Sequence, residues 1–221
     1  MTSASSQRIF HCAAILFDLD GVLVDSTASV ARQWALWAAE HNLSADEAVR
    51  VAHGRRTLET IRLLAPHLNA EEETVRLERR EADDTDGIGR IKGALELVSS
   101  LPRERWAVVT SGTRYLATRR LATNGLPTPA VFVTADEVAL GKPHPEPYLK
   151  GAELLGLSPN DCLVFEDAPA GIEAARAAGM TTIGVATTYP AAKLERANAV
   201  VRDLSHVKAW LNSDGLEVFL E

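Results

Sequence analysis

The sequence predicts an α/β fold: a Rossmann-like parallel sheet core with helices on both faces and an inserted small α-helical domain. Short apolar runs without charged residues alternate along the chain with longer segments of helical periodicity. Strands that are apolar on both faces are typical of a parallel sheet covered on each side. Residues 26–86 break this alternation because they have helical periodicity only, and they indicate the insertion.

The elements of the core follow one another in a regular order. The first apolar run is short, uncharged and ended abruptly by Asp-Leu-Asp-Gly. Strands are expected at Cys12–Phe17, Trp106–Val109, Val131–Val133, Cys162–Phe165 and Thr182–Val185. Helices are expected at Gly93–Ser100, Arg114–Asn124, Pro145–Leu155, Ala168–Ala178 and Ala191–Ala197.

The insertion divides the core into two pieces of sequence. We expect residues 1–25 and 87–221 to form the core, and residues 26–86 to form a helical cap. The segment Asp25-Ser26 leads into the cap, and the glycine-containing residues 86–90 lead out of it. Both segments are suited to act as hinges.

The composition is that of an ordinary soluble protein. Of 221 residues, 46% are hydrophobic and 24% charged, and no apolar run approaches the roughly 18 residues of a membrane-spanning helix. The formal net charge of -7 makes nucleic acid and anionic membranes unexpected partners. The start, Met1–Arg8, has no apolar centre of the signal-peptide type, so we expect a disordered tail and a cytoplasmic protein. Cys12 and Cys162 each begin an apolar run, which favours buried thiols over a disulfide.

Two aspartates follow directly on the first expected strand, in the segment Phe17-Asp-Leu-Asp-Gly21. If strand geometry continues through residue 20, its period of two points Asp18 and Asp20 to the same side. Two carboxylates that close together repel, and a hard cation such as Mg²⁺ keeps both ionised. Gly21 permits a sharp turn away from the sheet. Taken alone, the segment fits a turn capped by two aspartates equally well.

Hydroxyl groups end the strand that begins at Trp106, at Thr110 and Ser111, just before a helix. The Thr110 side chain and the backbone N–H groups after it are suited to bind a phosphate, aided by the positive end of the helix. Small hydroxyl residues also cap helices without binding anything. This segment alone leaves both roles open.

Lys142 lies in a rigid loop, Gly141-Lys-Pro-His-Pro-Glu-Pro147. Three prolines in five residues stiffen the backbone, which suits a cation that must be held in place. Most lysines are surface residues, but the rigid setting favours a functional role here.

Two adjacent acids, Glu166 and Asp167, end another apolar strand, and a helix is expected near Pro169. Ligands bind at the carboxyl ends of parallel strands, so these acids are expected at the same edge of the sheet as Asp18. Asp167 is the better candidate for a metal ligand, and Glu166 joins it directly or through water. In isolation, an acidic helix N-terminus favoured by the helix dipole explains the same residues.

The four segments occur in a fixed order along the chain: Asp18-Leu-Asp-Gly-Val, Val109-Thr-Ser-Gly, Gly141-Lys-Pro and Phe165-Glu-Asp. As a combination they resemble the motifs of the haloacid dehalogenase-like hydrolases. The resemblance extends from about residue 13 to residue 201 and includes the insertion, which lies where these enzymes carry their cap. Longer stretches around the last three segments, together with His53-Gly-Arg-Arg-Thr57, resemble the branch of glycerol-phosphate and 2-deoxyglucose-6-phosphate phosphatases.

The resemblance implies a Mg²⁺-dependent phosphatase that acts on a small phosphorylated metabolite. Asp18 would be the nucleophile that attacks phosphorus. Asp20 would protonate the leaving alkoxide and then deprotonate the water that hydrolyses the aspartyl-phosphate. The Mg²⁺ would be held by Asp18, the Asp20 main-chain carbonyl and Asp167, with Glu166 as a further ligand.

The same resemblance assigns the phosphate and substrate contacts. Thr110, the Ser111 N–H group and Lys142 would hold the phosphoryl oxygens. Arg56 is the expected specificity residue, because the second arginine of its motif faces the active site in that branch; a solvated arginine is the alternative.

Two other functions are open on the sequence. A sugar phosphomutase of the same superfamily relies on a cap histidine, and the comparable position here is Val30, which disfavours that function. A non-catalytic, phosphate-binding regulatory protein would share the scaffold, since fold alone does not establish function. Such a protein would be expected to lose an acid or the lysine, and none is missing here. We expect a monomer or a weak dimer.

Overall fold

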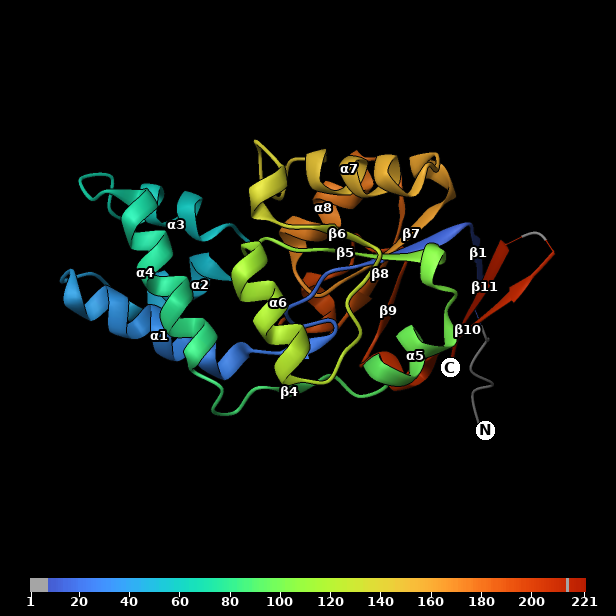
Figure 1. The fold of residues 1–221 in the computed structure, drawn as a ribbon, viewed down its shortest axis with the longest axis horizontal. Coiled ribbons are helices and arrows are strands. Elements are labelled where there is room, and N and C mark those ends of the chain that lie inside the picture. Colours follow the sequence, from blue (N-terminus) through green and yellow to red (C-terminus); the bar gives the residue numbers. More distant parts are fainter. Residues whose placement is uncertain (1–7, 214) are drawn as a thin grey trace.

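A computed structural model describes residues 8–213 and 215–221. Its centre is a six-stranded parallel sheet with the strand order β6-β5-β2-β7-β8-β9 (Figure 1). The strands are β2 (Ala14–Phe17), β5 (Trp106–Val109), β6 (Val131–Val133), β7 (Cys162–Glu166), β8 (Thr181–Val185) and β9 (Ala199–Val201). The predicted parallel sheet is confirmed, and β2 lies in its interior between β5 and β7.

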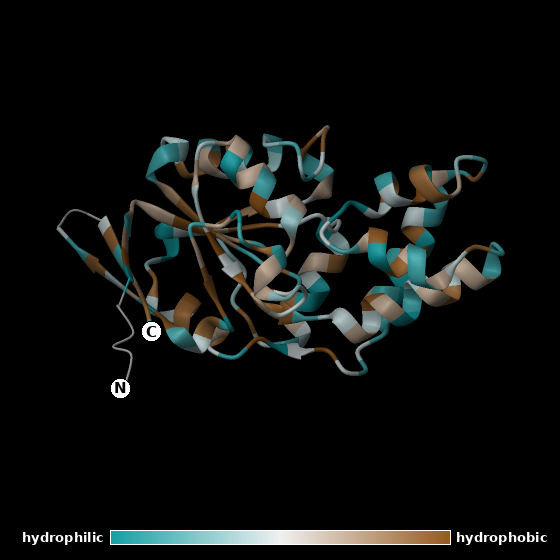
Figure 2. Ribbon diagram, turned by 180° about the vertical axis from the view of Figure 1, so that it is seen from behind, coloured by the Kyte–Doolittle hydropathy of each residue, from teal (hydrophilic) through white to brown (hydrophobic). Residues whose placement is uncertain are grey.

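Helices cover both faces of this sheet. Side chains alternate along each strand, so Ile15 and Phe17 pack on one face while Leu16 packs on the other. Figure 2 shows how strongly the apolar residues gather in these strands. The Phe17 face is covered by α5 (Ala94–Ser100) and α6 (Arg114–Thr123), and the Leu16 face by α7 (Glu146–Leu155) and α8 (Pro169–Ala177).

The segment 26–86, all of which the structure describes, contains helices and no strand, as predicted. These helices form one end of the molecule (Figure 1), and they bury an apolar cluster of their own that includes Trp34, Trp37 and Leu77. The short strands β3 (Val24–Asp25) and β4 (Gly89–Arg90) pair antiparallel, so the two connecting segments lie side by side. The helices are α1 (Thr27–Glu40), α2 (Ala45–Ala52), α3 (Thr57–Leu64) and α4 (Ala70–Asp83).

The run that was expected to form one strand at Cys12–Phe17 is divided between two sheets. The Ala13 N–H group donates to the Asp161 carbonyl at 2.6 Å, outside any strand ladder. The residues before it belong to β1 (Arg8–Cys12), which pairs with the C-terminal part of the chain. Apart from Arg8, the predicted tail Met1–Arg8 lies outside the described residues.

The predicted helix Ala191–Ala197 is wrong. Only one 3₁₀ turn forms there. A longer helix would leave too little chain to extend from it to β9, which starts at Ala199 and pairs with β8. Leu194 ends the turn as a fully buried side chain. The 3₁₀ helices are η1 (Arg103–Arg105), η2 (Ala135–Glu137), η3 (Pro159–Asp161), η4 (Ala191–Lys193) and η5 (Leu204–His206).

A three-stranded antiparallel sheet, β1-β11-β10, lies at the end of the molecule opposite the helical insertion (Figure 1). Sequence analysis did not predict β10 (Val207–Asn212) or β11 (Gly215–Leu220). Alternate residues of β11 are buried, as expected for a strand with one face on the core. In the part of the chain that the structure describes, no helix has both the length and the apolarity to span a membrane.

Candidate active site

The carboxyl ends of three adjacent strands bring the predicted site residues together. Asp18 follows β2, Thr110 follows β5, and Glu166 ends β7. A cavity between this sheet edge and the helical insertion is lined, among the predicted residues, by Asp18, Asp20, Thr110, Ser111 and Asp167. Its wall on the side of the insertion includes Val30, Trp34, His53, Arg55, Thr57 and Glu81.

Lys142 lies behind Asp18 and is 1% exposed. Its ammonium group donates to an Asp18 carboxylate oxygen at 2.7 Å, to a Glu166 carboxylate oxygen at 2.6 Å and to the Val109 carbonyl at 3.1 Å. Burial alone would lower the pKa of Lys142, but the Asp18 and Glu166 carboxylates outweigh it and raise that pKa overall. The lysine is therefore charged and fixed in place by three acceptors.

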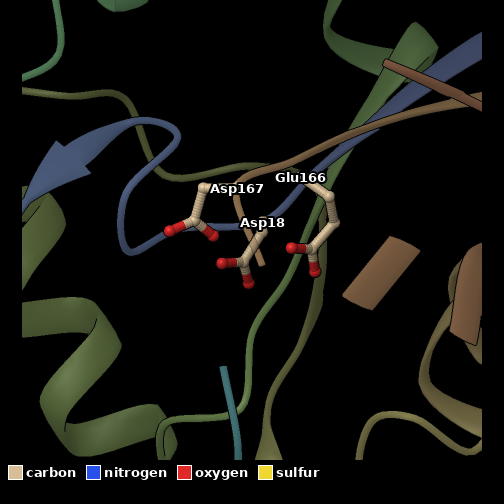
Figure 3. A group of neighbouring side chains, drawn as sticks. All are labelled: Asp18, Glu166 and Asp167. Carbon is tan, nitrogen blue, oxygen red and sulfur yellow. The ribbon is translucent and has the colours of Figure 1, made fainter. Parts of the chain in front are cut away.

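Three buried carboxyl groups, those of Asp18, Glu166 and Asp167, meet at this point (Figure 3). One oxygen from each lies within 4.8 Å of the others. Burial raises the pKa of Asp18 to about 7, and it raises the pKa of Asp167 well above its ordinary value, with further repulsion from the neighbouring carboxylates. With Lys142 as their cation, the three carboxylates would keep two uncompensated negative charges when ionised. A divalent cation with a preference for oxygen ligands, such as Mg²⁺, fits both the charge and the donor atoms.

Glu166 differs from Asp167 in how far its oxygens are already engaged. One Glu166 oxygen accepts from Lys142 and from the Tyr148 hydroxyl at 2.7 Å, and the other accepts from the Ala168 N–H group at 3.2 Å. Asp167 lines the cavity and accepts a hydrogen bond from Thr188. Of the two acids, Asp167 is the one whose carboxylate faces the cavity.

Two glycines let the backbone approach these acids closely. Gly21 has φ 80°, and a Cβ atom there would lie 2.0 Å from an Asp167 carboxylate oxygen. A Cβ atom on Gly171 would lie 1.7 Å from a Glu166 carboxylate oxygen. The glycine that sequence analysis assigned to a turn thus also makes room for Asp167.

Thr110 and Ser111 lie at the cavity between β5 and the start of α6. Thr110 is 3% exposed, and its hydroxyl accepts from the Gly112 N–H group at 3.2 Å. The Ser111 hydroxyl donates to the Gly54 carbonyl of the insertion at 3.3 Å. Both residues stand before the N-terminus of α6, where backbone N–H groups and the helix dipole favour an anion.

Asp20 is held through both of its carboxylate oxygens. The Ser26 hydroxyl donates to one oxygen at 2.6 Å, and the Arg120 guanidinium donates to the other. Arg120 also donates to Glu81 of α4 at 2.6 Å. Sequence analysis missed Arg120 and Glu81.

A signal for these two residues was present in the helical pattern. Arg120 shares the buried face of α6 with Leu116, Ala117 and Leu121. Glu81 shares the buried face of α4 with Leu77, Glu78 and Ala82. A charged residue in an apolar helical stripe requires a buried partner.

The structure does not bring Arg56 to the lining of the cavity. Its guanidinium donates to the Ala139 carbonyl at 2.8 Å and lies 3.4 Å from Glu59. This contact joins the insertion to the loop that precedes Lys142. The neighbouring Arg55 lines the cavity instead.

Known proteins are similar to this chain over most of its length. A family model described as haloacid dehalogenase-like hydrolase matches residues 12–179. Hexitol phosphatase A of Escherichia coli is 41% identical over 93% of this chain and 97% of its own length. Glycerol-1-phosphate phosphohydrolase 2 of Saccharomyces cerevisiae is 40% identical over 80% of this chain and 75% of its own. The crystal structure of a hydrolase from Pseudomonas syringae is 30% identical, with a TM-score of 0.73 over 86% of this chain and 93% of that chain.

Proposed function

Since this chain belongs to the haloacid dehalogenase-like hydrolase family, we propose that it hydrolyses phosphate monoesters of small polyols or sugars through an aspartyl-phosphate on Asp18. The observation that carries the proposal is the position of Asp18, in the cavity with the buried Lys142 ammonium behind it and Asp167 beside it. An aspartate is a weak nucleophile toward an anionic ester, and adjacent positive charge makes its approach to phosphorus feasible.

The first step is attack of an Asp18 carboxylate oxygen on phosphorus. The bond between phosphorus and the ester oxygen breaks, its electron pair stays on that oxygen, and Asp20 supplies a proton, so the alcohol leaves neutral. Asp20 then takes a proton from the water that attacks the aspartyl-phosphate. This second step releases inorganic phosphate and regenerates the Asp18 carboxylate.

The remaining residues of the site bind the phosphoryl group. Thr110 and Ser111 face it from the start of α6, and Lys142 supplies positive charge from behind Asp18. Asp18, Asp167 and the Asp20 main-chain carbonyl would hold Mg²⁺. When bound, the metal shields the negative charge that Asp18 and the phosphate share.

The metal requirement separates the roles of the two acids at the end of β7. For Asp167→Asn, we expect the Mg²⁺ concentration for half-maximal activity to rise at least about 10-fold, because a ligand oxygen that faces the cavity is lost. For Glu166→Gln, we expect a smaller shift in that concentration but a lower kcat at saturating Mg²⁺, because Glu166 fixes Lys142. Phosphate release across a Mg²⁺ titration measures both. Equal shifts in the two variants would instead make Glu166 a direct ligand.

The named relatives support the substrate class. The E. coli relative is named for hexitol phosphates and the yeast relative for glycerol 1-phosphate. The decisive test is a panel of glycerol, hexitol, hexose and 2-deoxyhexose phosphates, ranked by kcat/KM at saturating Mg²⁺. We expect these to exceed phosphoglycolate and nucleotides; the reverse order would reject the substrate class.

The residue at the position where phosphomutases carry their cap histidine favours hydrolysis over a phosphomutase reaction. Val30 lines the cavity and offers no group for proton transfer. In a mutase, isomerised sugar phosphate would form faster than free phosphate. We expect free phosphate to be the product that accumulates.

Residues 26–86 act, in this proposal, as a cap over a core formed by residues 1–25 and 87–221. Contacts from Ser111 to Gly54 and from Arg56 to Ala139 hold the two together, and the paired β3 and β4 connect them. Closure of the cap would exclude water during phosphoryl transfer. Specificity would come from side chains of the cap that line the cavity.

The proposed setting of the enzyme agrees with its charge. A net charge of -7 disfavours nucleic acid and anionic membranes as partners, and we propose a cytoplasmic monomer or weak dimer whose partner is a small phosphorylated metabolite. An anionic substrate would then depend on positive charge within the site, which Lys142 and a bound Mg²⁺ together would supply against the three carboxylates.

A further inference from the structure

A buried arginine joins the proposed acid–base residue to the helical cap. Arg120 extends from α6 of the core and is 5% exposed. One end of its guanidinium donates to Asp20, and the other end donates to Glu81 of α4 at 2.6 Å. Asp20 and Glu81 are far apart in the sequence, so this one side chain connects the loop after β2, the core helix and the cap.

The shape of the guanidinium group explains why this residue is an arginine. A guanidinium is planar, rigid and permanently charged, and its two terminal nitrogens can each hold a different carboxylate. Nη1 is engaged by Asp20 and Nη2 by Glu81, while Nε is buried and has no hydrogen-bond partner among the described residues.

These contacts leave the Asp20 carboxylate with one orientation. Arg120 holds one oxygen, the Ser26 hydroxyl holds the other at 2.6 Å, and the group still lines the cavity with its side chain 27% exposed. A carboxyl group that must deliver a proton to a leaving oxygen in its protonated form needs such a fixed direction, because acid catalysis depends on hydrogen-bond reach in the transition state.

We propose that Arg120, itself anchored by Glu81, is a positioning residue that aims Asp20 at the leaving oxygen of the substrate. The proposal rests on the proposed function, and specifically on Asp20 as the group that protonates the departing alkoxide. Because Glu81 belongs to the cap, the aim of Asp20 is complete only when α4 lies against α6. Cap closure and proton delivery are thereby coupled through one ion-paired chain of residues.

The leaving group of the substrate provides the test. Glycerol phosphate releases a strongly basic alkoxide that needs a proton, whereas an aryl phosphate such as 4-nitrophenyl phosphate releases a phenolate that departs without one. For Arg120→Lys, we expect kcat/KM for glycerol phosphate to fall about 10²-fold, and that for the aryl phosphate to fall less than about 10-fold. A residue that serves only the fold would lower both values by the same factor, and that result would overturn the proposal.

A second variant and a matched control keep the test independent of folding. Glu81→Gln leaves Arg120 in place and should show the same selective loss on glycerol phosphate to a smaller extent. Glu78→Gln is the control, because Glu78 lies on the same buried face of α4 but accepts from Thr113 at the start of α6. We expect the ratio of the two kcat/KM values to be unchanged in Glu78→Gln. If the ratio changed as much in Glu78→Gln as in Glu81→Gln, the loss would come from poorer docking of the whole cap and not from Arg120.

Two further variants separate this proposal from the function on which it rests. In an Asp20→Asn background, Arg120→Lys should change kcat/KM for glycerol phosphate by less than about 3-fold, because Arg120 acts through Asp20. If Arg120→Lys lowered kcat/KM by the same factor with and without Asp20→Asn, Arg120 would not act through Asp20. If Asp18→Asn kept wild-type turnover, the proposed function itself would fail; if it abolished turnover while Arg120→Lys slowed both substrates equally, only the role of Arg120 would fail.

Discussion

Replacement of Asp18 by asparagine is expected to lower kcat by about 10⁴-fold or more, because no other carboxylate can form the aspartyl-phosphate in its place. Asp167 lines the same cavity but is assigned to the metal, and Glu166 is engaged by Lys142, Tyr148 and the backbone. Phosphate release from a glycerol phosphate at saturating Mg²⁺ measures the loss.

The same substitution should leave the fold intact. The pKa of Asp18 is raised to about 7 by burial. When folding raises the pKa of an acid, the free energy of unfolding falls as the pH rises from the unfolded-state pKa to the folded-state pKa. In the metal-free protein, ionised Asp18 therefore lowers the free energy of unfolding at pH 7 and above. A neutral amide removes this cost, and Lys142 keeps Glu166 as its partner. We therefore expect a Tm in EDTA no lower than that of the wild type. Retained turnover in a well-folded Asp18→Asn protein would reject the covalent mechanism.

Much of the fold and the meeting of the main site residues could be predicted from sequence, because parallel topology forces the carboxyl ends of all strands to one edge. Once Asp18, Thr110 and Asp167 are assigned to strand ends, their proximity follows without any knowledge of side-chain contacts. The helical character of residues 26–86 was also predictable, since helical periodicity continues through them without a strand pattern.

Contacts between distant segments were not predictable in the same way. The Arg120 pairs depend on how α4 docks on α6, and no local pattern encodes that docking. The hydroxyl of Tyr148 reaches Glu166 from a helix on the opposite face of the sheet from α6, which limits the availability of Glu166 to a metal. The phosphate contacts expected of Thr110 and Ser111 stay predictions, as does the specificity role expected of Arg56, which does not line the cavity.

The C-terminal strands show a second limit. β10 pairs with its sequence neighbour β11, but β11 also pairs with β1, and the register of that second pairing depends on partners about 200 residues away. The helix expected at Ala191–Ala197 failed for a related reason. The local composition favours a helix, but the pairing of β9 with β8 extends the chain just after this segment.

Replacement of Lys142 by methionine is expected to affect both stability and activity. The substitution keeps most of the apolar volume but removes the cation that Asp18 and Glu166 share. Lys142 is only 1% exposed, so water cannot replace that cation. Breaking a buried ion pair by removing one partner leaves an uncompensated charge and costs about 3–5 kcal/mol in the free energy of unfolding. The loss of the positive charge behind Asp18 should lower kcat by about 10²–10³-fold.

Two comparisons identify the cause of the Lys142→Met effect. Lys150→Met removes an exposed lysine of α7 whose partner is Glu153, and it should change the free energy of unfolding by less than about 0.5 kcal/mol. Because Lys142→Met leaves the carboxylates with one more uncompensated charge, Mg²⁺ should raise its urea midpoint more than it raises that of the wild type. The difference in urea midpoint between the two proteins should therefore narrow as the Mg²⁺ concentration rises. A Lys142→Met protein with the wild-type midpoint in EDTA would show that the buried lysine does not balance these carboxylates.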